Sequence, residues 1–261
     1  MSDFLDTALN GRVLRVALNR PEKRNALNAV LCRELAQTCE AAEADPAIGA
    51  ILLTANGKAF CAGMDLSEAR PGNSEELNVA HERVFTLGAR LTKPLIGAVN
   101  GAALGGGAGL VANCHIVVAG KAATFGLTEI RLGLWPFLIY RAVTLAVGER
   151  RTAELALTGR IFNAQDAEAY GLVHQVTRDA DGTAAQLAAA IAAFSPTAVG
   201  HGLRFVRETR GKDAVTAGAI GRQIRNEVFA SEDFREGVRA FQEKRAPNWP
   251  SLKIGDRAPS I

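Results

Sequence analysis

Three consecutive glycines, Gly105 to Gly107, stand where a β-prone apolar run, residues 94–99, is followed by a segment that can be helical. The N–H groups that open a helix have no partner inside it, and the helix dipole gives that end a partial positive charge. Glycines leave these N–H groups bare, so a negative oxygen of a ligand could be held there. A tight turn that needs glycine only for close packing or positive φ explains the stretch equally well. The stretch alone leaves both interpretations open.

The sequence around these glycines does not match a nucleotide-binding loop. Leu110 stands where a G-x-G-x-x-G motif beginning at Gly105 needs its last glycine, and no Lys-Ser/Thr pair follows as in a P-loop. A transient oxyanion is therefore the expected ligand. An oxyanion hole needs two converging N–H donors. A second backbone-rich turn, around Met64, also follows an apolar strand and could supply the other donor.

Two carboxylates near these turns are candidates for proton transfer. Glu129 lies in the stretch 125–137, which is otherwise apolar apart from Arg131. Apolar surroundings raise a carboxyl pKa, which suits general acid–base catalysis, although a surface pair with Arg131 is the simpler interpretation from these residues alone. Asp65 could be catalytic, but an Asp after a tight turn is more often an Asx turn or a helix cap. The four histidines lack ligand-like spacing, so no metal site is predicted.

Repeated strand–helix units must position these turns. Residues 13–18 form a strand candidate, Asn28 can cap a helix that ends at Asp45-Pro46, and residues 49–54 read as a buried parallel strand. This is a βαβ unit with a right-handed crossover. The unit then repeats, after a polar loop that is expected to be mobile. The loop spans residues 67–74, and the repeat comprises a helix over about 75–91 and strands over 94–99 and 115–119.

The second half of the chain reads as mostly helical. Asn163 followed by Asp166 resembles a capping box, and Ser195-Pro196 places a cap before a proline at the first helical position. We therefore predict a core domain over residues 1–195 and a helical C-terminal region over 196–261. Within these, further helices are expected over 138–147, 152–157, 163–170 and 196–245, and an extended segment over 246–261.

Composition excludes several classes of protein. The 261 residues carry a net charge of +3 with no basic block interleaved with aromatics, so nucleic acid is not an expected partner. The acidic start lacks the parts of a signal peptide, and no apolar run approaches the length of a membrane span. The four cysteines form no C-x-x-C pair, which favours reduced thiols and a cytoplasmic location.

Taken together, the motifs resemble the crotonase (enoyl-CoA hydratase/isomerase) superfamily over nearly the whole chain. The resemblance implies an α/β fold, a spiral of repeated ββα units with a C-terminal helical region that forms trimers or dimers of trimers. The motifs that carry it are Asn19–Leu27, Ala59–Leu66, Asn100-Gly101 with Gly105–Gly107, Leu157–Gly159, Ala164–Ala167, Gly171–Val173 and Phe241–Arg245.

The resemblance also implies an acyl-CoA thioester as substrate, with no other cofactor because coenzyme A enters with it. The oxyanion donors would be the N–H groups of Met64 and Gly106, and Glu129 would carry the proton. Trp135 and Phe137 would line the acyl pocket. The positions implied for coenzyme A are Arg24, Ala26, Ala62, Asp65, Leu66, Phe241 and Lys244.

One departure from the family pattern bears on the reaction. Hydratases of the family carry two glutamates, whereas here Gly109 replaces the first and only Glu129 matches the second. A single carboxylate suffices to move a proton between carbons through an enolate, so we predict double-bond isomerisation, with bulky Trp135 and Phe137 excluding water. A glutamate introduced at Gly109 is expected to restore hydration unless it clashes with one of these rings. The alternatives are an enoyl-CoA hydratase and a CoA-binding protein without turnover.

Overall fold

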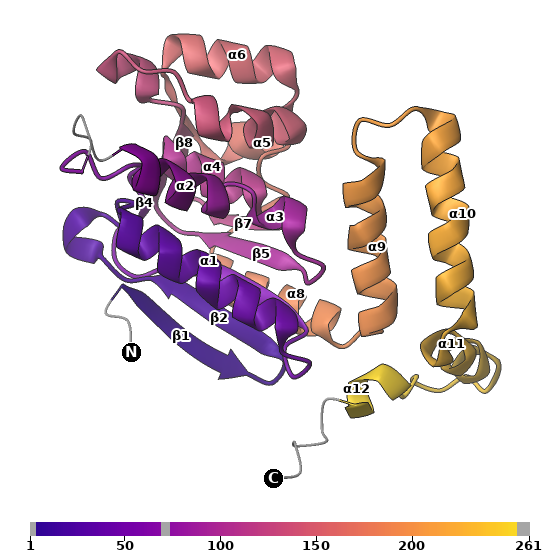
Figure 1. Ribbon diagram of the computed structural model, residues 1–261. Helices are drawn as coiled ribbons and strands as arrows, with labels where there is room; N and C mark the ends of the chain where they lie inside the picture. The colour runs from indigo at the N-terminus through magenta and orange to yellow at the C-terminus, as the bar shows by residue number, and fades with distance from the viewer. Residues whose placement is uncertain (1–3, 69–73, 255–261) are drawn as a thin grey trace.

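The chain forms two β-sheets with helices packed around them (Figure 1), in a computed structural model that describes residues 4–68 and 74–254. The larger sheet has the strand order β1-β2-β3-β5-β7-β10. β1 pairs antiparallel with β2, and the strands from β2 onward run parallel. The bounds are β1 Leu5–Asn10, β2 Val13–Leu18, β3 Ala50–Ala55, β5 Leu95–Val99, β7 Ile116–Gly120 and β10 Gln175–Thr177.

The predicted βαβ unit is confirmed. β2 and β3 are joined through α1 (Ala29–Ala44) and pair in parallel along their whole length. Asn28 caps α1, because its side-chain oxygen accepts a hydrogen bond from the N–H of Leu31 at 2.9 Å. The edge strand β1 was not predicted, since only Leu5 of its six residues is buried and the strand shows no alternating apolar pattern.

A second, smaller sheet was not predicted either. Its order is β4-β6-β8-β9, with bounds Ala59–Cys61, Ala102–Leu104, Thr124–Gly126 and Ile161–Asn163. Three-residue strands are too short to show a period in the sequence. The strand over 94–99 was expected to run directly into the glycines. That expectation was wrong, because β6 lies between β5 and Gly105. Successive units thus place one strand in each sheet before a helix, which confirms the ββα spiral.

The helices that follow the strands differ slightly from the prediction. The expected helix over 75–91 is two helices, α2 (Ser74–Val84) and α3 (Leu87–Arg90), separated where the Thr86 hydroxyl donates to the carbonyl of Glu82 at 2.8 Å. Residues 69–73 of the predicted polar loop lie outside the described part. The helices that follow are α4 Gly106–Asn113, α5 Phe137–Val147, α6 Glu149–Thr158 and α7 Ala164–Tyr170, with short 3-10 turns η1 Pro21–Lys23 and η2 Glu129–Leu132.

A helix that the sequence analysis missed covers the face of the larger sheet opposite to α1. α8 (Ala180–Ala192) buries four alanines at a spacing of four, and they form a cluster with Val13, Ile96 and other residues of the sheet. The alanines are Ala180, Ala184, Ala188 and Ala192. Their spacing was the signal that could have revealed the helix. Small side chains let the helix axis lie close to the strands.

The C-terminal region is helical as predicted, and α9 begins at Pro196 with Ser195 as its cap. α9 and α10 stand beside the core as an antiparallel pair, with α11 at their base (Figure 1). The segment expected to be extended contains a further helix, α12, so that expectation was wrong; the indole of Trp249 anchors it by donating to the carbonyl of Ala193. The bounds are α9 Pro196–Thr209, α10 Ala214–Ala230, α11 Glu232–Gln242 and α12 Pro250–Ile254. The division into two parts remains a prediction.

No single helix of the described residues is long and apolar enough to cross a membrane. α8 and α9 together meet the length and composition criteria, but they are bent by 106° relative to one another. Among the same residues, no group of three or more His, Cys, Asp or Glu side chains is arranged to hold a metal ion.

Candidate active site

The turn at Met64 leaves its backbone N–H outside the hydrogen-bond ladder. Leu27 and Met64 form an isolated parallel bridge. In it the N–H of Leu27 donates to the Gly63 carbonyl at 2.8 Å, and the N–H of Asp65 donates to the Leu27 carbonyl at 2.9 Å. The bridge therefore uses the groups on either side of Met64, and the N–H of Met64 itself faces away from Leu27.

The glycine turn lies directly against it. Gly105 has φ 51°, and Gly106 is the first residue of α4, so the Gly106 N–H has no partner inside the helix. A Cβ built on Gly63, whose φ is +100°, would lie 3.0 Å from the Leu104 carbonyl oxygen and 3.5 Å from the Gly106 nitrogen. Contact this close needs a glycine at Gly63. The two predicted donors therefore belong to adjoining turns, as an oxyanion hole requires.

Glu129 faces the same turns. It begins η2, and a Cβ built on Gly105 would lie 3.1 Å from its Oε1. Its Oε2 is buried and has no hydrogen-bond partner among the described residues. The surface pair with Arg131, the simpler interpretation from the sequence, is not formed among the described residues, so that interpretation was wrong. Burial raises the pKa of Glu129. A buried carboxylate with a free oxygen is costly for folding and is typical of a functional site.

Burial of Glu129 has a consequence for stability. Below the ordinary pKa of 4.5 the carboxyl is protonated in both folded and unfolded chains. As the pH rises from that value to the raised folded-state pKa, the unfolded chain loses the proton first, so folding loses stability. Since Glu129→Gln removes this titration, we expect its Tm to exceed that of the wild type above this window, and the difference to shrink in acid. Thermal unfolding over a pH series measures this. A difference that does not vary with pH would contradict it.

A cavity of about 480 Å³ joins these groups. Met64, Gly106 and Glu129 line it, together with both predicted acyl-pocket residues. Trp135 packs on Tyr140, with ring centroids 5.8 Å apart, whereas Phe137 is 72% exposed. The cavity also takes in polar residues that were not predicted as site residues: Glu68, Asn78, His81, Glu82 and Thr128. The rings of His81 and Phe85 stack. Their spacing of one helical turn in the predicted helix was the sequence signal that could have indicated this contact.

Asp65 is occupied by structural contacts. Its Oδ2 pairs with the Arg20 guanidinium at 3.1 Å, and its Oδ1 accepts hydrogen bonds from both the N–H and the hydroxyl of Ser67. The predicted Asx turn is thus present. Arg20 also donates to the Ala26 carbonyl at 2.7 Å. Asp65 therefore holds the segment around Ala26 in place, and its two oxygens are unavailable for proton transfer.

The remaining coenzyme A positions divide into two groups. Arg24 and Ala62 are joined by a hydrogen bond from the Ala62 N–H to the Arg24 carbonyl at 3.0 Å, close to Ala26, and Leu66 lines the cavity with Ala62. The C-terminal pair is elsewhere. Phe241 is 85% exposed and lines a separate cavity against α9 and Trp249, and Lys244 follows α11. One chain therefore does not bring Phe241 and Lys244 to Glu129, and their role remains a prediction.

The position of the missing carboxylate, Gly109, is closely packed. A Cβ built there would lie 2.2 Å from Cγ2 of Ile139 and 3.3 Å from Cδ1 of Phe85. Ile139 thus packs onto the Gly109 backbone, where a side chain would otherwise begin. The expected conflict of a glutamate with Trp135 or Phe137 stays a prediction, because these contacts are those of a Cβ alone. Ile139 is the closest obstacle.

Gly109→Ala is accordingly expected to destabilise the fold by about 1–3 kcal/mol, the usual cost of overpacking a core. The matched control is Gly202→Ala in α9, where a Cβ meets nothing within 4 Å. That change is expected to be neutral or to stabilise, since alanine is the better helix former. Denaturant unfolding of both variants measures the difference. Equal stability of the two would show that Ile139 moves aside freely.

Known proteins match this chain over nearly its whole length. Residues 8–252 match the family model "Enoyl-CoA hydratase/isomerase". The chain is 41% identical over 249 residues to enoyl-CoA hydratase EchA19 of Mycobacterium tuberculosis, covering 92% of this chain and 93% of that protein. It is 39% identical over 244 residues to 2,3-dehydroadipyl-CoA hydratase of Escherichia coli, covering 91% and 95%. A crystal structure of enoyl-CoA hydratase from Mycobacterium smegmatis superposes with a TM-score of 0.90 at 32% identity, covering 95% of this chain and 99% of that one.

These findings identify the class of protein. The chain belongs to the enoyl-CoA hydratase/isomerase family and has its α/β crotonase fold. It is an acyl-CoA enzyme of that family.

Proposed function

We propose that this enzyme adds water to the double bond of a 2-enoyl-CoA. The thioester oxygen would lie between the N–H groups of Met64 and Gly106, which stabilise the enolate as negative charge develops on that oxygen. As the oxygen of a water adds to the β-carbon, Glu129 would accept a proton from that water, and it would then deliver a proton to the α-carbon of the enolate. The observation that carries the proposal is the Glu129 carboxylate, lying against Gly105 with one oxygen free, in the cavity that Met64 and Gly106 also line.

Support for hydration comes from the relatives, because the two nearly full-length relatives compared above are named as hydratases. Coenzyme A would lie along the segment from Arg24 to Ala26 and Ala62, which are held together by backbone hydrogen bonds and by the Arg20–Asp65 pair. Leu66 would contact the thioester arm. Water would be held by Glu129 and one of the polar residues of the cavity.

Double-bond isomerisation is the second candidate, and one observation favours it. The place of the second family glutamate is taken by Gly109 with Ile139 packed upon it. A single carboxylate can move a proton from one carbon to another without positioning water. The prediction of isomerisation made from the sequence therefore remains, as the alternative to hydration.

A comparison of rates separates the candidates. The wild type is assayed for water addition to crotonyl-CoA and for double-bond migration in a 3-enoyl-CoA. Faster hydration supports the proposal, and faster migration favours isomerisation. Turnover of neither substrate, combined with acyl-CoA binding by calorimetry, would leave the third possibility, a protein that binds CoA without chemistry.

Assembly is a separate proposal. Phe241 is exposed and far from Glu129 within one chain, so it and Lys244 would serve coenzyme A only in another copy or after rearrangement. We therefore expect trimers or pairs of trimers, with the helices after Ser195 at the contacts. Light scattering at micromolar concentration checks this, and a stable monomer would refute it. All four cysteines are free thiols, and the cytoplasmic location inferred from them stays a prediction.

A further inference from the structure

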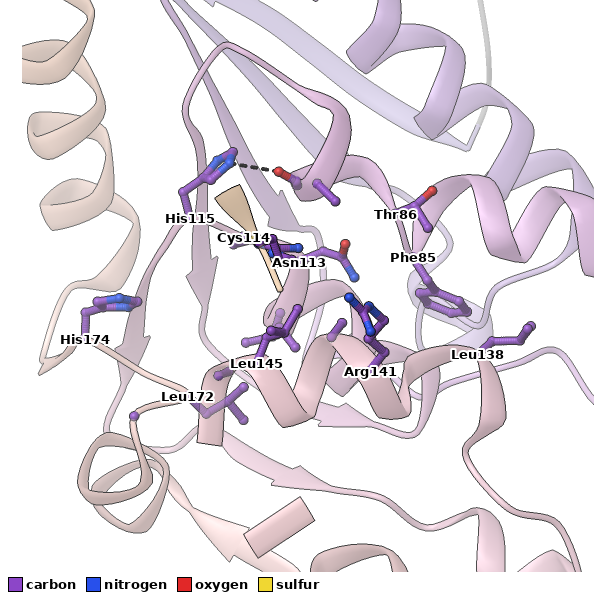
Figure 2. Close-up of a pocket in the computed structure, with 18 residues that line it drawn as sticks. Phe85, Thr86, Asn113, Cys114, His115, Leu138, Arg141, Leu145, Leu172 and His174 are labelled. Carbon is purple, nitrogen blue, oxygen red and sulfur yellow. Dashed lines mark hydrogen bonds between the residues drawn. The ribbon is translucent and has the colours of Figure 1, made fainter. Parts of the chain in front are cut away.

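A second cavity, of about 440 Å³ (Figure 2), shares lining residues with the cavity that contains Glu129. Two side chains, Phe85 and Leu138, line both cavities and thus form the partition between them. Phe85 lies against α4, since a Cβ built on Gly106 or on Gly109 would be 3.1 Å and 3.3 Å from its ring. Phe85 therefore lies against the turn that carries the Gly106 N–H, beside the place expected for the thioester.

The second cavity is basic. Its lining includes Arg141 and Arg210, and none of its described lining residues is Asp or Glu. Neither arginine forms an ion pair with another described residue. His115 adds no free group, because its Nδ1 accepts from the Leu95 N–H and its Nε2 lies 3.0 Å from the Gly88 carbonyl, a contact drawn in Figure 2. His174 also lines the cavity, and its Nδ1 accepts a hydrogen bond from the Val117 N–H at 3.1 Å. The permanent charge is thus that of two guanidinium groups, both on exposed residues.

Arg141 is the arginine nearest to the partition along the chain. It follows Leu138 by three residues on α5, so the two side chains share one face of the helix. In Figure 2 the Arg141 side chain is turned toward Asn113 and Phe85. A ligand that reached this cation from the Glu129 cavity would have to displace Phe85 or Leu138, and it would then meet the cation one helical turn further on.

We propose that the acyl group of the substrate ends in a carboxylate, which Arg141 binds. This deepens the function proposed above and rests on it. Arginine presents a planar fork that matches a carboxylate through two parallel hydrogen bonds. Arg141 is an exposed residue, so its guanidinium stays hydrated beside a plain alkyl chain and gains a hydrogen-bonding partner only from a polar chain end. Apolar walls that lead to a cation fit an apolar chain with an acidic end.

The test compares two thioester series, ω-carboxyacyl-CoAs and their uncharged ω-methyl esters, over several chain lengths. Binding of the saturated thioesters by calorimetry needs no turnover, and kcat/KM is measured on the 2-enoyl forms. We expect the wild type to prefer the acid about two- to fivefold, because water screens an ion pair made by an exposed arginine. The preference should peak at one chain length, because Arg141 is fixed on α5. A general attraction to positive charge would favour the acid at every length and would overturn the proposal.

Variants of Arg141 test whether this side chain, rather than the rest of the cavity, gives the preference for the acid. Arg141→Met keeps the apolar stem and should abolish the acid preference while binding of the methyl esters is unchanged. Arg141→Lys should retain part of it. Arg150→Met is the matched control, because Arg150 is an exposed residue of α6 that lines neither cavity. This variant should keep the full preference for the acid.

The results also distinguish the two proposals. Turnover of both series without an acid preference refutes the terminal carboxylate and leaves the proposed function standing. Acid-selective binding that depends on Arg141, without turnover, supports the site and refutes the proposed function. Equal binding of acid and ester at all lengths overturns the role of Arg141 whatever the activity.

Discussion

Replacement of Glu129 by glutamine is expected to lower kcat about a hundred- to ten-thousandfold, the usual contribution of a positioned acid or base. Glutamine keeps the shape that lies against Gly105 but cannot exchange a proton. The loss should be similar for hydration and for double-bond migration, because both pass through the same enolate. Steady-state rates on crotonyl-CoA and on a 3-enoyl-CoA measure it.

Binding is the control for this variant. The dissociation constant of a saturated acyl-CoA should change little in Glu129→Gln, since the amide fills the same volume in the cavity. Glu75→Gln provides a matched carboxylate change at an exposed residue of α2 that does not line the cavity, and it is expected to retain full activity. Unchanged turnover in Glu129→Gln would remove this residue from the chemistry.

Loss of the Gly106 N–H is expected to reduce kcat about a hundred- to a thousandfold, the usual cost of one oxyanion donor. Gly106→Pro deletes the donor, and proline is well tolerated at the first position of a helix such as α4. The reason for the loss is that charge develops on the thioester oxygen in the transition state, so the missing hydrogen bond affects the rate more than the binding.

Gly106→Ala is the control, because it adds a Cβ but keeps the N–H. That Cβ would lie 3.1 Å from both Leu27 Cδ1 and Phe85 Cζ, so moderate crowding is expected. The donor accounts for the effect only where proline costs far more than alanine. Equal losses in the two variants would assign the effect to crowding, and a folded proline variant with normal kcat would disprove the oxyanion hole.

Long elements with a clear apolar period could be predicted from the sequence. The strand over 13–18 and the helix capped by Asn28 were confirmed, since each pattern is local and each cap involves neighbouring residues. The short strands β4, β6, β8 and β9 could not be predicted, because their stability comes from pairing with residues far away in the chain.

The candidate site shows the same division. The residue types at Met64, Gly106 and Glu129 were visible in the sequence, and the resemblance assigned them roles. Their proximity was expected from the two strand ends and from the resemblance, but the contacts that produce it were not visible: the Leu27–Met64 bridge and the close contact of Gly63 with the glycine turn. The free Oε2 of Glu129 likewise follows from burial, a property of the whole fold, whereas the sequence alone favoured pairing with Arg131.

The sequence itself therefore determined the residue types of the site and the local periods of the long elements. Examples of the first are the glycine turns, the single Glu129, and Gly109 in place of a second glutamate. The tertiary structure alone decided what surrounds them. It placed Ile139 on Gly109, left Phe241 away from Glu129, and set Arg141 behind Phe85 and Leu138. The physical reason is that hydrogen-bonded caps and periods act over a few residues, whereas packing and desolvation join residues that only the folded chain brings together.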